Sequence, residues 1–262
     1  MRKDQTGEII VKKYVDMYVL QTVFQPKEQI DKILEIISEL GFSIICVTLD
    51  AKKEQNIFEE IKKKAEDFNI EVYRRINLSP KNVEDLKNKL RQFRRKCEIL
   101  TVKCLEKKIC TWAARDRRVD ILNFPFFECL KNFTESTANL AVEGDTAIEI
   151  WFKQFLDVRG IKRARLIAEA RRVAKIALKK GVKIIIDSGA ENIFEMRSPR
   201  ELGALGYLLD IPEKQIELTV SENPLNILRS NLSKLSPNFV LPGVEIVGEE
   251  EENWLKKKET DT

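Results

Sequence analysis

Three carboxylates are the residues with the most evident potential for chemistry. Asp120, Glu149 and Asp187 each fall in a short apolar run with the composition of a β-strand. Carboxylate oxygens are the ligands that Mg²⁺ prefers, so one interpretation is a carboxylate-metal barrel phosphoesterase or lyase. However, no histidine or lysine is visibly paired with them as a base. The 262 residues include no histidine at all, which excludes histidine-based triads and histidine-ligated zinc.

The cysteines do not form a metal-binding pattern. Cys97, Cys104 and Cys110 are separated by six and five residues, whereas zinc knuckles use two to four. We therefore expect core or surface thiols. Five scattered cysteines, an odd number, also argue against a disulfide framework and for a reducing cytoplasm. The longest apolar run, residues 42–49, has the length of a strand and not of a membrane span, and no signal peptide is expected.

The strongest candidate for binding is a basic segment. Residues 159–183 hold ten bases and one acid, Glu169, a net charge of +9. Helical periodicity puts four of the bases on the face opposite the apolar residues: Arg165, Arg172, Lys175 and Lys179. Lys162 lies one turn before Arg165 and is a further candidate for RNA contact. Such a one-sign face favours a polyanion, and we expect RNA phosphate contacts there with Arg172 exposed. The alternative is a merely solvated face.

Two further basic clusters allow more than one interpretation. The first comprises Arg91, Arg94 and Arg95, which either bind RNA or simply complement a helix carboxyl terminus. The second comprises Arg115, Arg117 and Arg118, which could bind RNA phosphates. It lies close to Trp112, for which core packing is favoured over base stacking.

Two other features lie near predicted strand ends. Arg197 either holds a phosphate or, as we favour, forms an internal ion pair with Glu149 or Asp187. The aromatic loop 123–127 (NFPFF) is either a protein-binding patch or, as we favour, a seal for the end of the fold.

The elements that must position these residues alternate regularly. Short apolar runs predict strands, and helix-period segments between them predict helices, with Gly41 and Gly181 after two of them. The predicted strands are 14–23, 42–49, 70–76, 97–103, 119–123, 146–150, 182–187 and 216–220. The predicted helices are 26–40, 54–68, 80–95 with Ser79 as its N-cap, 128–140, 160–180, 199–209 and 224–235.

Seven or eight β-α units in about 220 residues leave a parallel barrel or a doubly wound sheet. No Gly-x-Gly-x-x-Gly follows a strand, so we predict an α/β barrel of the TIM type. We assign a flexible basic N-terminus at 1–13, a single barrel domain at 14–235 and an acidic, disordered tail at 236–262. The tail carries seven acids and three lysines, so residues 1–235 hold 43 bases and 35 acids, a net charge of +8. This basic body favours polyanionic partners.

The sequence around the last long strand is specific enough to compare with known families. Residues 184–190 (IIIDSGA) are followed by 196–210 (MRSPRELGALGYLLD). This pattern resembles the archaeal ribonuclease P protein component 3 family, the counterpart of the eukaryotic thirty-kilodalton subunit. In that family a strand ends in Ser-Ser-Gly-Ala, and Asp187 here replaces the first serine. The positions that match the motif, to which we give a structural role, are Ser188, Gly189, Ala190, Pro199 and Glu201.

The resemblance extends over most of the body, through 40–42 (LGF), 117–122 (RRVDIL), 147–150 (AIEI) and 220–224 (VSENP). It implies a barrel like that of the PHP metallophosphoesterases, without their histidine metal ligands and without a cofactor. It also implies a non-catalytic subunit of ribonuclease P, which removes the 5′ leader of precursor tRNA. Its partners would be ribonuclease P RNA, which would hold the catalytic metal, and other protein subunits including component 2. A third possibility is an RNA-binding subunit of another particle.

Overall fold

The computed structural model describes residues 12–49, 55–236, 238–241 and 244–245. The proposed N-terminal segment 1–13 and the acidic tail 236–262 therefore lie mostly outside the described residues. The tail's described part includes a small antiparallel pair, β8 (Phe239–Leu241) with β9 (Val244–Glu245).

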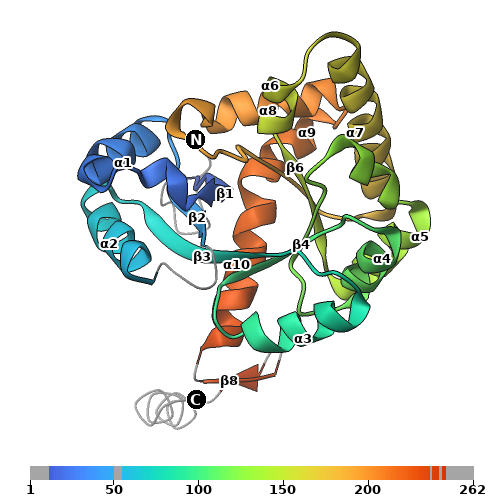
Figure 1. Cartoon of the computed structure of the whole chain (residues 1–262), viewed down its shortest axis with the longest axis horizontal. Coiled ribbons are helices and arrows are strands. Elements are labelled where there is room, and N and C mark those ends of the chain that lie inside the picture. The colour runs from blue at the N-terminus through green and yellow to red at the C-terminus, as the bar shows by residue number, and fades with distance from the viewer. Residues whose placement is uncertain (1–11, 50–54, 237, 242–243, 246–262) are drawn as a thin grey trace, which may run out of the picture.

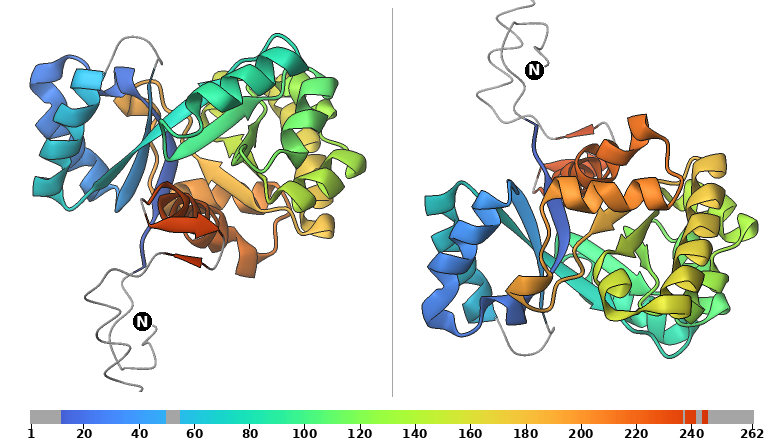
Figure 2. Two further views of the ribbon diagram at one scale, coloured as in Figure 1. Left: turned by 90° about the horizontal axis from the view of Figure 1, so that it is seen from below. Right: turned by 90° about the horizontal axis from the view of Figure 1, so that it is seen from above.

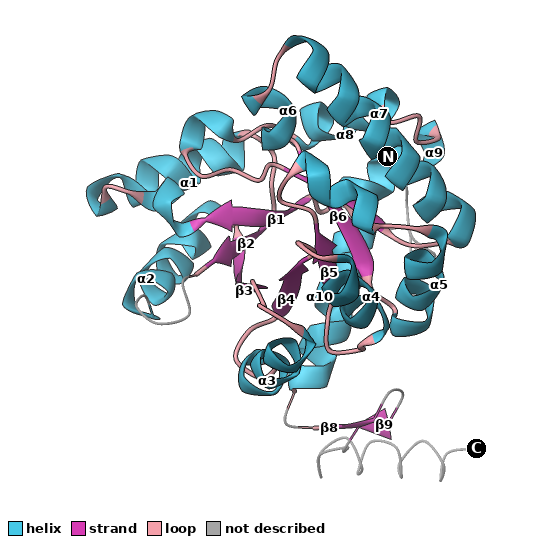
Figure 3. Cartoon of the chain, turned by 45° about the vertical axis from the view of Figure 1, so that its right-hand side comes forward, coloured by secondary structure: helices cyan, strands magenta, loops and turns pink. Residues whose placement is uncertain are grey.

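Seven parallel strands form the centre of the molecule, paired in chain order (Figures 1 and 3). They are β1 (Val15–Leu20), β2 (Ile44–Thr48), β3 (Glu71–Leu78), β4 (Ile99–Lys103), β5 (Ile121–Asn123), β6 (Ala147–Trp151) and β7 (Ile184–Asp187). The first and last strands meet just beyond β7, where Val19 bridges Ala190 and the amide of Leu20 donates to the Ala190 carbonyl at 2.9 Å. The ring is nearly closed, which confirms the predicted α/β barrel.

Helices surround the strands and bury their apolar faces against the sheet (Figure 3). In α1, for example, the residues Ile30, Ile33, Leu34 and Ile37 recur at helical spacing and are all buried. The helices are α1 (Ile30–Glu39), α2 (Gln55–Ala65), α3 (Val83–Phe93), α4 (Lys107–Arg115), α5 (Glu135–Gly144), α6 (Lys153–Asp157), α7 (Gly160–Lys180), α8 (Pro199–Leu208), α9 (Glu213–Ile216) and α10 (Glu222–Leu235).

The predicted strand 216–220 is wrong. This segment is helical, through α9 and the 3-10 helix η6 (Glu217–Val220). Its buried residues are Ile216, Thr219 and Val220, a spacing of three and four that suits a helix and not a strand. The barrel accordingly has seven strands within the described ranges.

Three smaller differences concern helices. The prediction that Ser79 is the N-cap of a helix beginning at residue 80 is wrong. Helix α3 begins after Asn82, whose side chain accepts from the Asp85 amide at 2.9 Å. The predicted helix 128–140 is divided into the 3-10 helix η4 (Phe127–Asn132) and α5, with Thr134 capping α5. The short helices α4 and α6 were not predicted.

The barrel interior has an apolar end and a polar end. Helix α10 lies across the amino ends of the strands (Figure 2), where its Leu225, Ile227 and Leu228 pack on the inward side chains. Those side chains come from six strands and are Val15, Met17, Ile44, Cys46, Ile99, Ile121, Ala147 and Ile185. Buried polar side chains gather instead toward the carboxyl ends, the usual functional end of such barrels.

Candidate functional site

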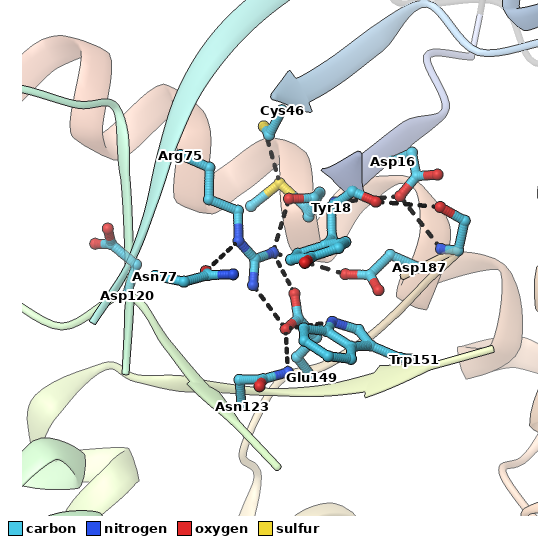
Figure 4. A network of polar contacts seen from close by, with 12 residues as sticks. Asp16, Tyr18, Cys46, Arg75, Asn77, Asp120, Asn123, Glu149, Trp151 and Asp187 are labelled. Atoms are coloured by element: carbon cyan, nitrogen blue, oxygen red, sulfur yellow. Dashed lines mark hydrogen bonds and ion pairs between the residues drawn. The ribbon is translucent and has the colours of Figure 1, made fainter. Parts of the chain in front are cut away.

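A buried arginine occupies the interior toward the carboxyl ends of the strands. Arg75 on β3 is 0% exposed, and its guanidinium binds both carboxylate oxygens of Glu149 on β6, with Nη2 at 2.7 Å from Oε2 (Figure 4). Nη1 also donates to the carbonyl of Met17 at 2.7 Å, and Nε donates to Oδ1 of Asn77 at 2.8 Å. The guanidinium carbon lies 4.8 Å from the centroid of the Tyr18 ring. The interior of this barrel thus contains its own fixed cation.

Glu149 is the acceptor around which this network is built. Besides Arg75, the side-chain amide of Asn123 and the indole N–H of Trp151 donate to its Oε2, at 2.7 and 2.8 Å (Figure 4). Burial opposes ionisation, but Arg75 and these donors outweigh it and hold the pKa of Glu149 below its ordinary value. Glu149 is therefore an ionised carboxylate matched to a single cation.

Asp187 has the opposite environment. It is fully buried, and Arg75 Nη1 is 3.9 Å from its Oδ2. Burial and the neighbouring Glu149 raise the pKa of Asp187 well above its ordinary value. Arg75 and Glu149 neutralise each other, so this part of the interior has no second cation to offset a charge on Asp187.

The motif residues close the barrel beside this network. Oδ1 of Asp16 accepts from the amides of Tyr18 and Ser188, both at 3.2 Å, and the Ser188 hydroxyl donates to the Tyr18 carbonyl at 3.1 Å. Gly189 has a φ of +64°, and a Cβ there would lie 2.8 Å from Cβ of Trp151. Only glycine fits this turn without displacing the indole.

The second half of the motif builds the start of α8. Ser198 and Glu201 form a capping box, each bonding the backbone of the other, and Pro199 fills the first helical position. The motif residues therefore shape the backbone.

The structure does not bring Asp120, Glu149 and Asp187 together into the magnesium site that one interpretation required. Asp120 precedes β5 and lies toward the amino end of the barrel, where its Oδ2 accepts from Arg94 at 2.6 Å and from the amide of Leu100 at 2.7 Å. Glu149 lies further toward the carboxyl end, on the neighbouring strand β6, and is held by Arg75. The described part of the chain contains no group of three Cys, Asp or Glu side chains arranged to hold a metal ion. All five cysteines are buried and free, and Cys97, Cys104 and Cys110 belong to the core.

Arg197 does not form the ion pair that we expected with Glu149 or Asp187. Its Nη1 donates to the carbonyls of Phe194 and Met196, at 2.8 and 2.7 Å, and its guanidinium carbon lies 5.9 Å from the centroid of the Phe152 ring. The cation that pairs with Glu149 is Arg75, which was not predicted from the sequence. The only signal for it was a charged residue inside a predicted strand.

The predicted RNA-binding residues divide into two groups. Four of them have internal partners: Arg94 pairs with Asp120, Arg118 with Asp116, Arg172 with Glu169, and Lys179 with Glu135. The other eight have no acidic partner among the described residues. Arg115 and Arg197 contact aromatic rings instead, and the remaining six are Arg91, Arg95, Arg117, Lys162, Arg165 and Lys175. Arg115 lies 3.7 Å from the centroid of the Trp112 ring, which is half-buried against the core and also covered by Lys87 at 4.1 Å.

Arg172 is not the exposed side chain that we expected. It is half-buried and donates to the carbonyls of Phe133 and Leu130, at 3.0 and 2.9 Å, which fastens α7 to the end of η4. The expectation that aromatics of loop 123–127 seal the fold holds for Phe124 alone. Phe124 is buried against Phe133, whereas Phe126 is 61% exposed.

Comparisons with known proteins agree on one family. Residues 13–235 match the family model described as RNase P subunit p30. The chain is 30% identical to Ribonuclease P protein component 3 of Methanocaldococcus jannaschii over 227 residues, which is 86% of this chain and 96% of that protein. It is 27% identical to the protein of the same name from Methanosarcina barkeri over 237 residues, 90% of this chain and 97% of the relative.

The fold agrees as well. A chain in a cryo-EM structure of archaeal ribonuclease P with mature tRNA superposes with a TM-score of 0.78 at 26% identity, covering 90% of this chain and 99% of that one. None of the helices in the described ranges is both long and apolar enough to span a bilayer.

Proposed function

This chain belongs to the RNase P subunit p30 family and is a protein subunit of ribonuclease P, and from this premise we propose how it serves that complex. It binds and positions the ribonuclease P RNA, together with a partner protein, component 2. It leaves cleavage of the 5′ leader of precursor tRNA to the RNA. We also propose a cytoplasmic location, because all five cysteines are free thiols.

The pair of Arg75 and Glu149 carries the non-catalytic part of this proposal. A barrel enzyme of the metallophosphoesterase kind needs its strand-end carboxylates free to hold metal ions. Here the guanidinium already binds Glu149 with both of its terminal nitrogens, and both side chains are 0% exposed. To bind Glu149, a metal ion would have to displace the Arg75 guanidinium, which is part of the chain and is closed to solvent.

The unpaired cations support RNA binding. Arg91, Arg95 and Arg117 lie on the side of the barrel formed by α3 and α4, and Lys162, Arg165 and Lys175 lie on α7. Because these side chains have no acidic partner within the described residues, neutralising RNA phosphates costs them no internal ion pair.

A reconstituted complex tests the proposal. Cleavage of precursor tRNA is measured with ribonuclease P RNA, Mg²⁺ and the protein subunits, with and without this chain. We expect the rate to fall when the chain is omitted, and we expect the purified chain with Mg²⁺ alone to leave the precursor intact. Cleavage by the chain alone that disappears in Glu149→Gln would show that the barrel itself is catalytic.

A further inference from the structure

A groove beside the carboxyl end of the barrel combines aromatic, basic and hydrogen-bonding side chains. It has a volume of about 420 Å³ and lies between loop 125–128, α6 and the first half of α7. Its lining includes Phe126, Phe127, Glu128, Gln154, Lys162 and Arg165. These residues come from the segments that follow β5 and β6, at the end of the barrel where functional groups are usually placed.

The aromatic side chains are exposed although their loop is firmly held. Phe126 is 61% exposed and Phe127 is 36% exposed. Their backbone is anchored on one side by buried Phe124, whose carbonyl accepts from Gln154 Nε2 at 2.6 Å. On the other side, Arg172 binds the carbonyl of Leu130 in η4. A rigid loop that presents a phenyl ring to solvent is preorganised for a flat ligand.

The charges around the rings suit a phosphate group. Neither Lys162 nor Arg165 has an acidic partner in the part of the chain that the structure describes. Asp157, an acid of the same lining, is paired with Lys153 at 2.9 Å. The groove therefore offers two free cations next to an exposed ring, the combination with which proteins bind single-stranded RNA.

The remaining polar groups include two hydrogen-bond acceptors. Gln154 uses one of its two amide N–H groups on the Phe124 carbonyl, which leaves its side-chain oxygen as an acceptor. Glu128 is exposed and contributes a carboxylate. Acceptors beside a stacking ring suit a base that carries an exocyclic amine, such as adenine, cytosine or guanine, better than uracil.

We propose that this groove binds an unpaired RNA nucleotide, with its base stacked on Phe126 and its phosphate held by Lys162 and Arg165. This inference rests on the proposed RNA-binding function and names the kind of RNA element that the protein contacts. It differs from the phosphate contacts proposed for Lys175 and Arg95, because it requires a base that is free of a duplex.

The test uses the full chain and ribonuclease P RNA with the other protein subunits. Phe126→Ala is expected to weaken the affinity of the assembled proteins for the RNA about 5- to 150-fold, the usual effect of losing one stacked base. Phe126→Trp is expected to retain the affinity, because tryptophan also stacks. Tyr207→Ala is the matched control, since Tyr207 on α8 is 59% exposed but lies outside the groove. Thermal melting of each variant establishes that the fold is intact.

Short single strands distinguish the base from the phosphate. The full chain should bind oligo(rA) more tightly than oligo(rU), and Phe126→Ala should remove that preference. Arg165→Ala should weaken both, with a salt slope lower by about 0.7. Unchanged RNA affinity in Phe126→Ala and Arg165→Ala overturns the inference while the proposed function stands, provided that the wild type binds RNA. If Phe126→Ala instead loses a protein subunit and keeps its RNA affinity, the groove is a protein contact. If the wild type itself does not bind RNA, both proposals fail.

Discussion

The carboxylate of Asp16 accepts a hydrogen bond from the amide of Ser188, 172 residues further along the chain, at 3.2 Å. The bond joins β1 to the end of β7, next to the single bridge between Val19 and Ala190 that closes the ring. Asp16 is 0% exposed, and burial raises its pKa to about 6. The closure of the barrel is therefore coupled to a titratable group.

Asp16→Asn should stabilise the protein at neutral pH and not at acidic pH. A carboxyl group whose pKa is higher in the folded chain than in the unfolded chain binds more protons when folded. The free energy of unfolding therefore falls as the pH rises from about 4 to about 6 and stays lower above that. Asparagine keeps the acceptor oxygen without the charge, so the gain should approach about 3 kcal/mol at pH 7 and be less than about 1 kcal/mol at pH 4. Urea unfolding at both pH values measures it, and an equal effect at the two would contradict the prediction.

Arg75→Met should be among the most destabilising single substitutions in the protein. It leaves Glu149 ionised and buried without its cation, which costs about 3 to 5 kcal/mol. Glu149→Gln keeps an acceptor for Asn123 and Trp151, so the double variant Arg75→Met/Glu149→Gln should be more stable than Arg75→Met alone. A double-mutant cycle from urea denaturation measures the coupling. Additive losses would mean that the two side chains do not depend on each other.

Much of the architecture could be predicted because local patterns determine it. Helix α7 was predicted at its observed bounds, since its apolar residues recur regularly and Gly181 ends it with a φ of +80°. The pairing of Arg75 with Glu149, 74 residues apart, leaves no local pattern. Asp120 was grouped with Glu149 and Asp187 by residue type, although it comes just before its strand whereas Asp187 ends its own, and opposite ends of parallel strands lie at opposite ends of the barrel.

The basic face of α7 shows a second limit. A helical wheel counts the charges of one helix, but Glu135 of α5 neutralises Lys179 from outside it. Likewise, the carbonyls that hold Arg172 belong to η4 and the residue that follows it. Tertiary contacts thus divide a uniform row of cations into members with a structural partner and members without one.

Lys175 and Arg172 should behave differently although they share one helix face. Lys175 is exposed and has no acidic partner in the described ranges, so Lys175→Ala should leave the melting temperature unchanged and flatten the dependence of log RNA affinity on log salt by about one unit. Arg172→Ala should lower the melting temperature, because two carbonyls lose their donor. Filter binding over a range of salt concentrations, together with thermal melting, separates the two effects. An unchanged slope in Lys175→Ala would mean that this face is only solvated.

The neighbours Arg94 and Arg95 provide the sharpest comparison on the other basic surface. Arg94 binds the Asp120 carboxylate at 2.6 Å and donates to the carbonyls of Arg118 and Glu98. Arg94→Ala leaves Asp120 buried without its cation and should cost about 3 kcal/mol of stability. Burial already raises the pKa of Asp120, so Asp120→Asn should recover part of that loss.

Arg95 is exposed and has no acidic partner within the described residues, so Arg95→Glu should change stability by no more than about 0.5 kcal/mol. If this surface binds the RNA backbone, the same variant should weaken binding about equally for different RNA sequences, because a phosphate contact does not read bases. It should also flatten the salt slope, since one fewer counterion is released and a repulsive charge is added. Urea denaturation and salt-dependent binding, measured for Arg94→Ala and Arg95→Glu in parallel, should therefore show a fold defect in the first and a binding defect in the second. Full RNA affinity and an unchanged slope in a folded Arg95→Glu protein would exclude Arg95 from the phosphate contacts.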